Sequence, residues 1–236
     1  MTGRTLLLLV FAAAAAIGLA VLLIPSPILP KPSDAWEIVA ADAWLVGTPE
    51  APFAYAGGDA VRSVDATATL DFDSDDGAGS LLARITLPED QDAALPFDAV
   101  PGEEILLRAP LAAADLMTDS PIWGNTGISE SRLPQTYALL AGSVIFDVTI
   151  GARSVTEIAT GFWSVADALR REDGSIGQQG LIFSPLLREK TGFSDPSRQE
   201  LTVLLYDNSG GESPPVLLHV VFSSVTIAQR PEAPAS

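Results

Sequence analysis

The chain of 236 residues contains no cysteine and only one histidine. Without cysteine it cannot form a disulfide, a zinc–thiolate site or a thiol nucleophile. The single histidine, His219, excludes a metal site built from several histidines, and any serine triad would have to use it. His219 lies in the apolar stretch 216–222, which is typical of a buried central strand. We therefore expect His219 to be a structural residue.

Positive charge is also scarce, because 13 lysines and arginines face 30 aspartates and glutamates, for a net charge of −17. All of the acidic residues follow residue 30. A chain of this sign repels nucleic acid and anionic lipid headgroups, so a nucleic-acid-binding function is excluded. The same field can attract basic protein surfaces or cations, although solubility alone is a sufficient reason for it.

Catalytic and cofactor motifs are missing as well. Lys190-Thr191-Gly192 copies one fragment of the penicillin-recognising enzymes, but no serine stands three residues before either lysine. The glycines of 174–180 do not have the spacing of a dinucleotide fingerprint, and the chain has no phosphate-binding loop. The sequence thus assigns no catalytic residue, cofactor or metal ligand. A hydrolase that uses two carboxylates stays open, because the separation of acidic groups in space cannot be read from the chain.

The most informative feature that is present is an uncharged apolar run over residues 6–24. A bilayer core about 30 Å thick needs roughly 20 such residues, so we predict a transmembrane signal anchor. Residues 1–5, which include Arg4, form the predicted cytoplasmic leader, because basic residues favour that side. A cleaved secretory signal is the alternative, but its apolar part is usually about 7 to 15 residues long and ends at a small-x-small site.

The anchor divides the rest of the chain into three predicted parts. Residues 25–34 are a Pro-rich stem that acts as a semi-rigid spacer. Residues 35–229 form one periplasmic or extracellular domain, whose length is enough for a sizeable core without disulfides. Residues 230–236 are a predicted disordered tail.

Strand patterns dominate the domain. Apolar and polar residues alternate strictly over 64–72 and again over 81–87, which predicts a β-hairpin. A second hairpin is predicted from 201–206 and 216–227 around the loop that contains Asn208. Three further strands are expected at 104–108, 137–150 and 155–163, with a tight turn at Gly151-Ala152 between the last two. The segment 36–46 fits both a helix and a strand, and we favour the strand.

Helix signals are few and short. Capping residues and apolar spacing predict single helical segments at 164–171, 184–192 and 110–117. Many short strands separated by glycine and proline are typical of two packed sheets. The predicted fold is therefore mainly β, an antiparallel two-sheet β-sandwich with a few short helices.

One acidic run, residues 71–77, has the composition of a cation site. Alternate carboxylates followed by a glycine can wrap Ca²⁺. In an EF-hand loop, however, the sixth position is glycine and the twelfth is glutamate, where this chain has Asp76 and Leu82. We therefore expect a solvated hairpin turn here.

The best candidates for a binding face are two polar, glycine-containing loops predicted at 120–137 and 173–197. The first combines Trp123, Arg132 and Tyr137, which are residue types enriched at binding hot spots. The alternative is that Trp123 and Tyr137 only cap the core.

These observations predict a membrane-anchored, non-enzymatic accessory module that contacts another envelope protein through its loops. The alternative is a carboxylate-based hydrolase or a carbohydrate-binding domain that acts on an envelope or extracellular polymer. The sequence does not indicate which small molecule, if any, is bound.

Overall fold

The computed structural model describes the domain in segments. These are residues 35–47, 61–73, 76–89, 97, 99–123, 135–156, 158–172, 194–206 and 216–230. The predicted leader, anchor and stem (residues 1–34), the predicted helix 184–192 and residues 231–236 of the predicted tail lie outside the described residues. In the described segments, no helix has the length and apolar character needed to cross a membrane.

Almost all of the described chain is extended. The strands are β1 (Ala35–Val46), β2 (Val61–Asp73), β3 (Ala78–Thr86), β4 (Glu104–Ala112), β5 (Leu116–Trp123), β6 (Gln135–Ile150), β7 (Arg153–Ser154), β8 (Ala159–Ala168), β9 (Asp195–Tyr206) and β10 (Val216–Arg230). A single 3₁₀ turn, Ala113–Asp115, separates β4 from β5.

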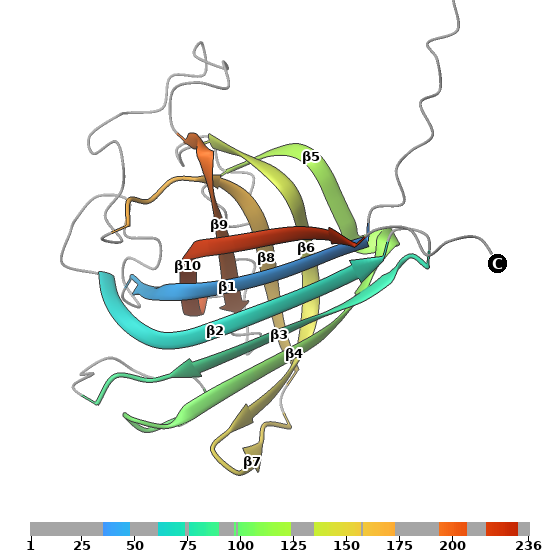
Figure 1. The fold of residues 1–236 in the computed structure, drawn as a ribbon. Helices are drawn as coiled ribbons and strands as arrows, with labels where there is room; N and C mark the ends of the chain where they lie inside the picture. The colour runs from blue at the N-terminus through green and yellow to red at the C-terminus, as the bar shows by residue number, and fades with distance from the viewer. Residues whose placement is uncertain are drawn as a thin grey trace, which may run out of the picture. The chain divides into compact units, whose positions relative to one another are not determined.

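The strands form one antiparallel sheet that closes on itself. Its order is β4-β3-β2-β1-β10-β9-β8-β6, and the first and last of these strands also pair, from Ile105↔Ile150 to Arg108↔Asp147. The result is an eight-stranded barrel, with β1 to β4 side by side in Figure 1. The predicted two-sheet sandwich is therefore wrong, because the pairing of β4 with β6 leaves one continuous wall.

The length of β6 explains how the barrel closes while carrying extra strands. One end of β6 pairs with β4, and residues 135–142 at the other end pair with β5, on the same side of β6. The 3₁₀ turn lets the chain shift between these two pairings, so the predicted helix over 110–117 is replaced by strand on both sides of one short turn. The strand β7 only extends the hairpin at Gly151-Ala152.

The barrel encloses an apolar core made of alternate residues from every strand of the ring. Trp163, Phe222, Ile38, Leu70 and Leu107 are among the fully buried side chains. An eight-stranded barrel has an interior that side chains can just fill, so this core stabilises the fold in place of disulfides. The predicted hairpins β2–β3 and β9–β10 are confirmed, and so is the predicted strand over 36–46.

The predicted helix over 164–171 is wrong, because Ser164 to Ala168 belong to β8. Both faces of this strand are buried, Trp163 and Val165 in the core and Phe162 and Ser164 on the other face. A strand that is buried on both faces loses the alternation that identifies it.

His219 is also buried, at 2% exposure, in β10 between β1 and β9, which confirms its predicted place in a central strand.

Candidate functional site

The candidate site begins at a bend that β1 and β10 share. Ala40 and Ala43 of β1 both face the core, as do their register partners Val225 and Phe222 of β10. Core-facing residues in a regular strand are two apart, but here both strands place them three apart. The two strands therefore change direction together at Asp42 and its neighbours.

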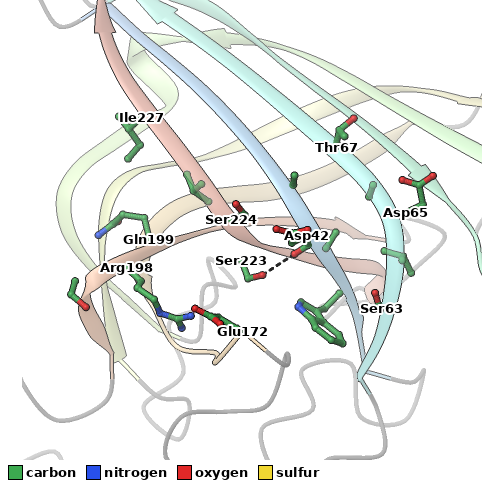
Figure 2. A pocket seen from close by; sticks show the side chains of 17 residues that line it. Asp42, Ser63, Asp65, Thr67, Glu172, Arg198, Gln199, Ser223, Ser224 and Ile227 are labelled. Carbon is green, nitrogen blue, oxygen red and sulfur yellow. Dashed lines mark hydrogen bonds between the residues drawn. The ribbon is translucent and has the colours of Figure 1, made fainter.

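The bend also interrupts pairing with β2. Register pairs stop after Ala40↔Ala68 and resume at Ala43↔Val64, so two residues of β1 lie opposite three of β2. Asp42 adopts the left-handed region with φ 53, which aspartate tolerates better than most residues. The Ser223 hydroxyl donates a hydrogen bond of 2.9 Å to the Asp42 carbonyl oxygen and ties the two strands together at this level (Figure 2).

A groove with a volume of about 870 Å³ follows this bend (Figure 2). Its lining comes from five separate stretches of the described chain. They are Ala41 to Trp44 of β1, Ser63 to Thr67 of β2, Glu172 shortly after β8, Ser197 to Gln199 near the start of β9, and Ser223, Ser224, Val225 and Ile227 of β10. Hydroxyl, amide and carboxylate groups therefore share the groove with one indole and one guanidinium group.

The guanidinium group already has partners. Nε of Arg198 lies 3.4 Å from Oδ2 of Asp195, and its side chain also donates to the carbonyl oxygen of Arg170. The Asp195 carboxylate accepts hydrogen bonds from the Ser197 hydroxyl (2.6 Å) and backbone N–H (3.0 Å). These bonds, together with the charge of Arg198, lower the pKa of Asp195. Arg198 is thus held in place and its charge is balanced by its own neighbour.

Two carboxylates that line the groove, those of Asp42 and Asp65, differ from Arg198 because they have no such partner. Asp42 directly precedes Ala43 on β1 and Asp65 directly follows Val64 on β2, so both lie at the break in register between these strands. Both are exposed, and neither side chain has a hydrogen bond or ion pair with any described residue. The groove therefore has an excess of unbalanced negative charge.

Two neutral groups in the groove also have unused hydrogen-bonding capacity. Nε1 of Trp44 is buried and has no hydrogen-bond acceptor in the described part of the chain. The amide of Gln199 donates to Oδ1 of Asp167 over 3.0 Å, but its oxygen is buried without a donor. Buried polar atoms without partners are uncommon. Both atoms are covered by protein, so neither is open to the groove.

Among the described residues of the two loops predicted as the binding face, only Ser197 lines this groove. Of the predicted loop 173–197, Ser197 lines the groove, and residues 173–193 lie outside the described residues. The predicted loop 120–137 is partly strand, since Trp123 ends β5 and Tyr137 belongs to β6, with residues 124–134 outside the description.

The acidic run 71–77 occupies the β2–β3 hairpin. Asp73 ends β2, and the backbone N–H of Asp76 donates to its Oδ1 over 3.3 Å, as in a turn. Over the described ranges, no group of three or more acidic, cysteine or histidine residues is arranged to hold a metal ion.

No protein-family profile, curated protein or solved structure matches this chain. Its site is therefore defined by its own geometry.

Proposed function

We propose that this protein is a non-enzymatic interaction module of the cell envelope, which residues 6–24 anchor in the membrane and whose barrel binds a partner outside it. The groove at the β1–β10 bend is the proposed binding site. The observation that carries the proposal is the groove itself, which is lined by hydroxyl and amide groups and by the carboxylates of Asp42 and Asp65, two side chains that have no ion pair with any described residue.

Binding is favoured over catalysis by the exposure of the carboxylates. A glycosidase keeps its general acid protonated by burial in an apolar environment. Asp42 and Asp65 are both exposed. The groove also contains no histidine or lysine among its lining residues.

A carbohydrate-binding function is the second candidate, because an indole beside hydroxyl and amide groups is the usual composition of a sugar site. Trp44, Gln199 and Ser223 supply these groups in the same groove. A carbohydrate could donate hydrogen bonds from its hydroxyls to Asp42 and Asp65, but it would leave their negative charges unbalanced.

Site-specific photo-crosslinking in intact cells tests the proposed function. Thr67 and Thr69 are exposed residues of β2, and of the two only Thr67 lines the groove. A photoreactive amino acid at position 67 is expected to give one discrete protein adduct. The same amino acid at position 69 serves as the matched control and is expected to give little of this adduct. Equal adducts at both positions, or none at position 67, would contradict the proposal.

A further inference from the structure

We propose that residues 223–228 of β10 form an open strand edge in this groove, to which an extended segment of the partner protein adds as one more strand. The segment pairs with β10 through main-chain hydrogen bonds and places aliphatic side chains, at alternate positions, over the core-facing side of the edge. This inference rests on the proposed function and specifies how the partner binds.

The edge exists because β10 leaves β9 at the bend. The two strands pair only as far as Phe222↔Leu201, whereas β10 continues to pair with β1 up to Arg230. The start of β9 pairs with β8 on its other side. β10 is therefore a central strand over 216–222 and an edge strand beyond it, and Figure 1 shows the last part of β10 beside β1 and away from the start of β9.

The backbone of this edge has hydrogen-bonding groups to spare. Alternate residues of a strand direct their N–H and C=O groups to opposite sides, so about half of residues 223–228 direct theirs away from β1. Besides the ladder with β1, the only hydrogen bond found for these residues in the described chain runs from the Ser223 hydroxyl to Asp42. A row of open backbone groups is a template for pairing with another chain.

The groove lies between the two strands that separate. It is lined from β10 by Ser223, Ser224, Val225 and Ile227, and from β9 by Ser197 to Gln199 (Figure 2). Val225 and Ile227 pack against the core but are only partly buried, since no described strand lies beside β10 on this side. An added strand would therefore bury apolar surface as well as pair with the backbone.

The composition of the edge is an independent observation that points to the same ligand. Strand edges are commonly protected from foreign strands by proline, charge or an irregularity. Three other open edges in the described chain contain proline, namely Pro110 in β4 beyond its pairing with β6, Pro121 in β5 and Pro196 in β9. Residues 223–228 read Ser-Ser-Val-Thr-Ile-Ala, without proline, glycine or charge, and are rich in strand-forming residues. This edge is thus left open to pairing.

The surroundings of the edge favour a flexible segment over a second copy of the barrel. Arg198 and Gln199 of β9 line the groove opposite β10, so an incoming strand has to fit between two walls of the same molecule. A single extended segment can do this, whereas a strand of another barrel carries its neighbouring strands with it. The net charge of −17 also opposes the approach of an identical chain.

Hydrogen exchange of the full chain in neutral detergent micelles tests this inference with a synthetic peptide of alternating valine and threonine that has lysine at both ends. Two control peptides have the same sequence but carry N-methyl groups on alternate amides, one on the odd-numbered residues and one on the even-numbered residues. Side chains and charge are therefore identical, while only one of the two sets of amides can face β10 in a strand pairing.

We expect the unmodified peptide, at about ten times its Kd, to slow exchange of the open amides within 223–228 about tenfold and to leave residues 105–108 unchanged. One N-methylated peptide is expected to bind at least about tenfold more weakly, and the other less than about threefold more weakly. Equal losses for the two methylated peptides, or protection only outside 223–228, would overturn the inference.

Val225→Lys tests the same edge from the side of the protein, because it places a charge where the added strand would cover it. Val39→Lys is the matched control, since Val39 is 46% exposed on β1, where it is the register partner of Thr226, and does not line the groove. We expect Val225→Lys to weaken peptide binding at least about fivefold and Val39→Lys less than about twofold. Equal losses in the two variants would contradict the inference. If Val225→Lys fails to fold, the methylated peptides decide the question on the unaltered protein.

The outcomes also separate this inference from its alternatives and from the function on which it depends. Protection of 223–228 that rises with protein concentration, without peptide, would identify a second copy as the occupant and overturn the inference. If the peptide does not bind and the adduct at position 67 persists, strand addition is wrong and the groove remains a binding site. If that adduct is absent, the proposed function itself fails.

Discussion

At the scale of single residues, close packing within the barrel wall decides which side chains are allowed. Gly161 of β8 is buried where the strand passes the Phe146 ring and the carbonyl oxygen of Leu204. A methyl group added at Gly161 would overlap both of them. Phe146 is itself part of the core, so the ring cannot move outward without leaving a void.

Gly161→Ala is therefore expected to lower the free energy of unfolding by about 1–3 kcal/mol, because an overpacked core forces side chains and backbone out of place. Urea denaturation followed by tryptophan fluorescence measures this change. Ser143→Ala, at an exposed position of β6, is the control and is expected to change stability by less than about 0.5 kcal/mol. A Gly161→Ala protein as stable as the parent would show that the wall is looser than described.

Tyr206, at the end of β9, has a phenol whose ionisation is opposed by burial. It packs against the cluster that contains Phe162 and Leu204, and burial raises its pKa from 10.0 to about 12. The folded state thus holds the phenolic proton more tightly than the unfolded state. The resulting contribution to stability is complete below pH 10 and is lost as the pH rises toward 12.

The pH dependence of Tyr206 can be measured in two ways. Absorbance at about 295 nm is expected to show a late phenol ionisation near pH 12 that Tyr206→Phe removes. The free energy of unfolding should also decline between about pH 10 and pH 12 more steeply in the parent than in Tyr206→Phe. Identical profiles for the two proteins would contradict the raised pKa.

At the scale of structural elements, the shared bend of β1 and β10 creates the candidate site. It needs a residue at position 42 that accepts a positive φ, and it is held by the hydrogen bond from Ser223. β-branched residues strongly disfavour this backbone region, whereas glycine accepts it without strain.

Asp42→Val is expected to destabilise the protein by about 1–3 kcal/mol, while Asp42→Gly leaves stability within about 0.5 kcal/mol of the parent. Both variants remove the same carboxylate, so the difference between their urea midpoints reports the backbone alone. If valine and glycine gave the same midpoint, the bend would not depend on the left-handed conformation of Asp42.

The sequence predicted elements better than it predicted their assembly. Residues 64–72 alternate strictly because one face of β2 is buried and the other exposed, so the strand was evident. The helix expected over 164–171 failed because β8 is buried on both faces. The bend was visible only indirectly, since the mixed helix and strand pattern of 36–46 results from the irregular spacing between Ala40 and Ala43.

The candidate site could not be predicted, because its lining residues are up to about 180 positions apart in the chain, as Asp42 and Ser223 are. No local motif connects such positions, and only the pairing of β1 with both β2 and β10 brings them together. The loops predicted at 120–137 and 173–197 stay a prediction, because most of their residues lie outside the description, and composition does not reveal where strands bend.

At the scale of the whole molecule, the pairing of β4 with β6 distinguishes a closed barrel from two stacked sheets. In a sandwich one of these strands would be an edge, with backbone N–H groups open to solvent. Here Ile105 to Arg108 pair with Asp147 to Ile150, while β3 covers the other side of β4.

Hydrogen exchange is expected to protect the amides of residues 105–108 to a degree similar to those of the central strand β10. Peptide-resolved mass spectrometry on the full chain can compare the two segments directly. Residues 109–112, which pair with β3 but for which no pairing with β6 is found, supply the internal reference. Rapid exchange at 105–108 would indicate an open sheet.

Membrane attachment is the second prediction at this scale, and it concerns residues 6–24. The full chain is expected to stay in the membrane pellet after an alkaline wash, and deletion of residues 6–24 is expected to release it. A protease added outside intact cells or spheroplasts should digest the barrel. Mature protein that begins near Trp36 and is recovered in the soluble fraction would instead support the cleaved secretory signal.

The first and last strands of the barrel are neighbours in space, and Ala35 at the start of β1 is the register partner of Arg230 at the end of β10. The two ends of the barrel chain are therefore adjacent, so they could be joined to each other and the chain could be opened at another loop instead. A short linker from Arg230 to Ala35, with new ends made between β3 and β4, would join β1 and β10, two of the strands that line the groove, and leave the ring of strand pairs intact. Such a permuted chain would be tethered from the end of the barrel opposite Ala35 and Arg230, with the groove left in place.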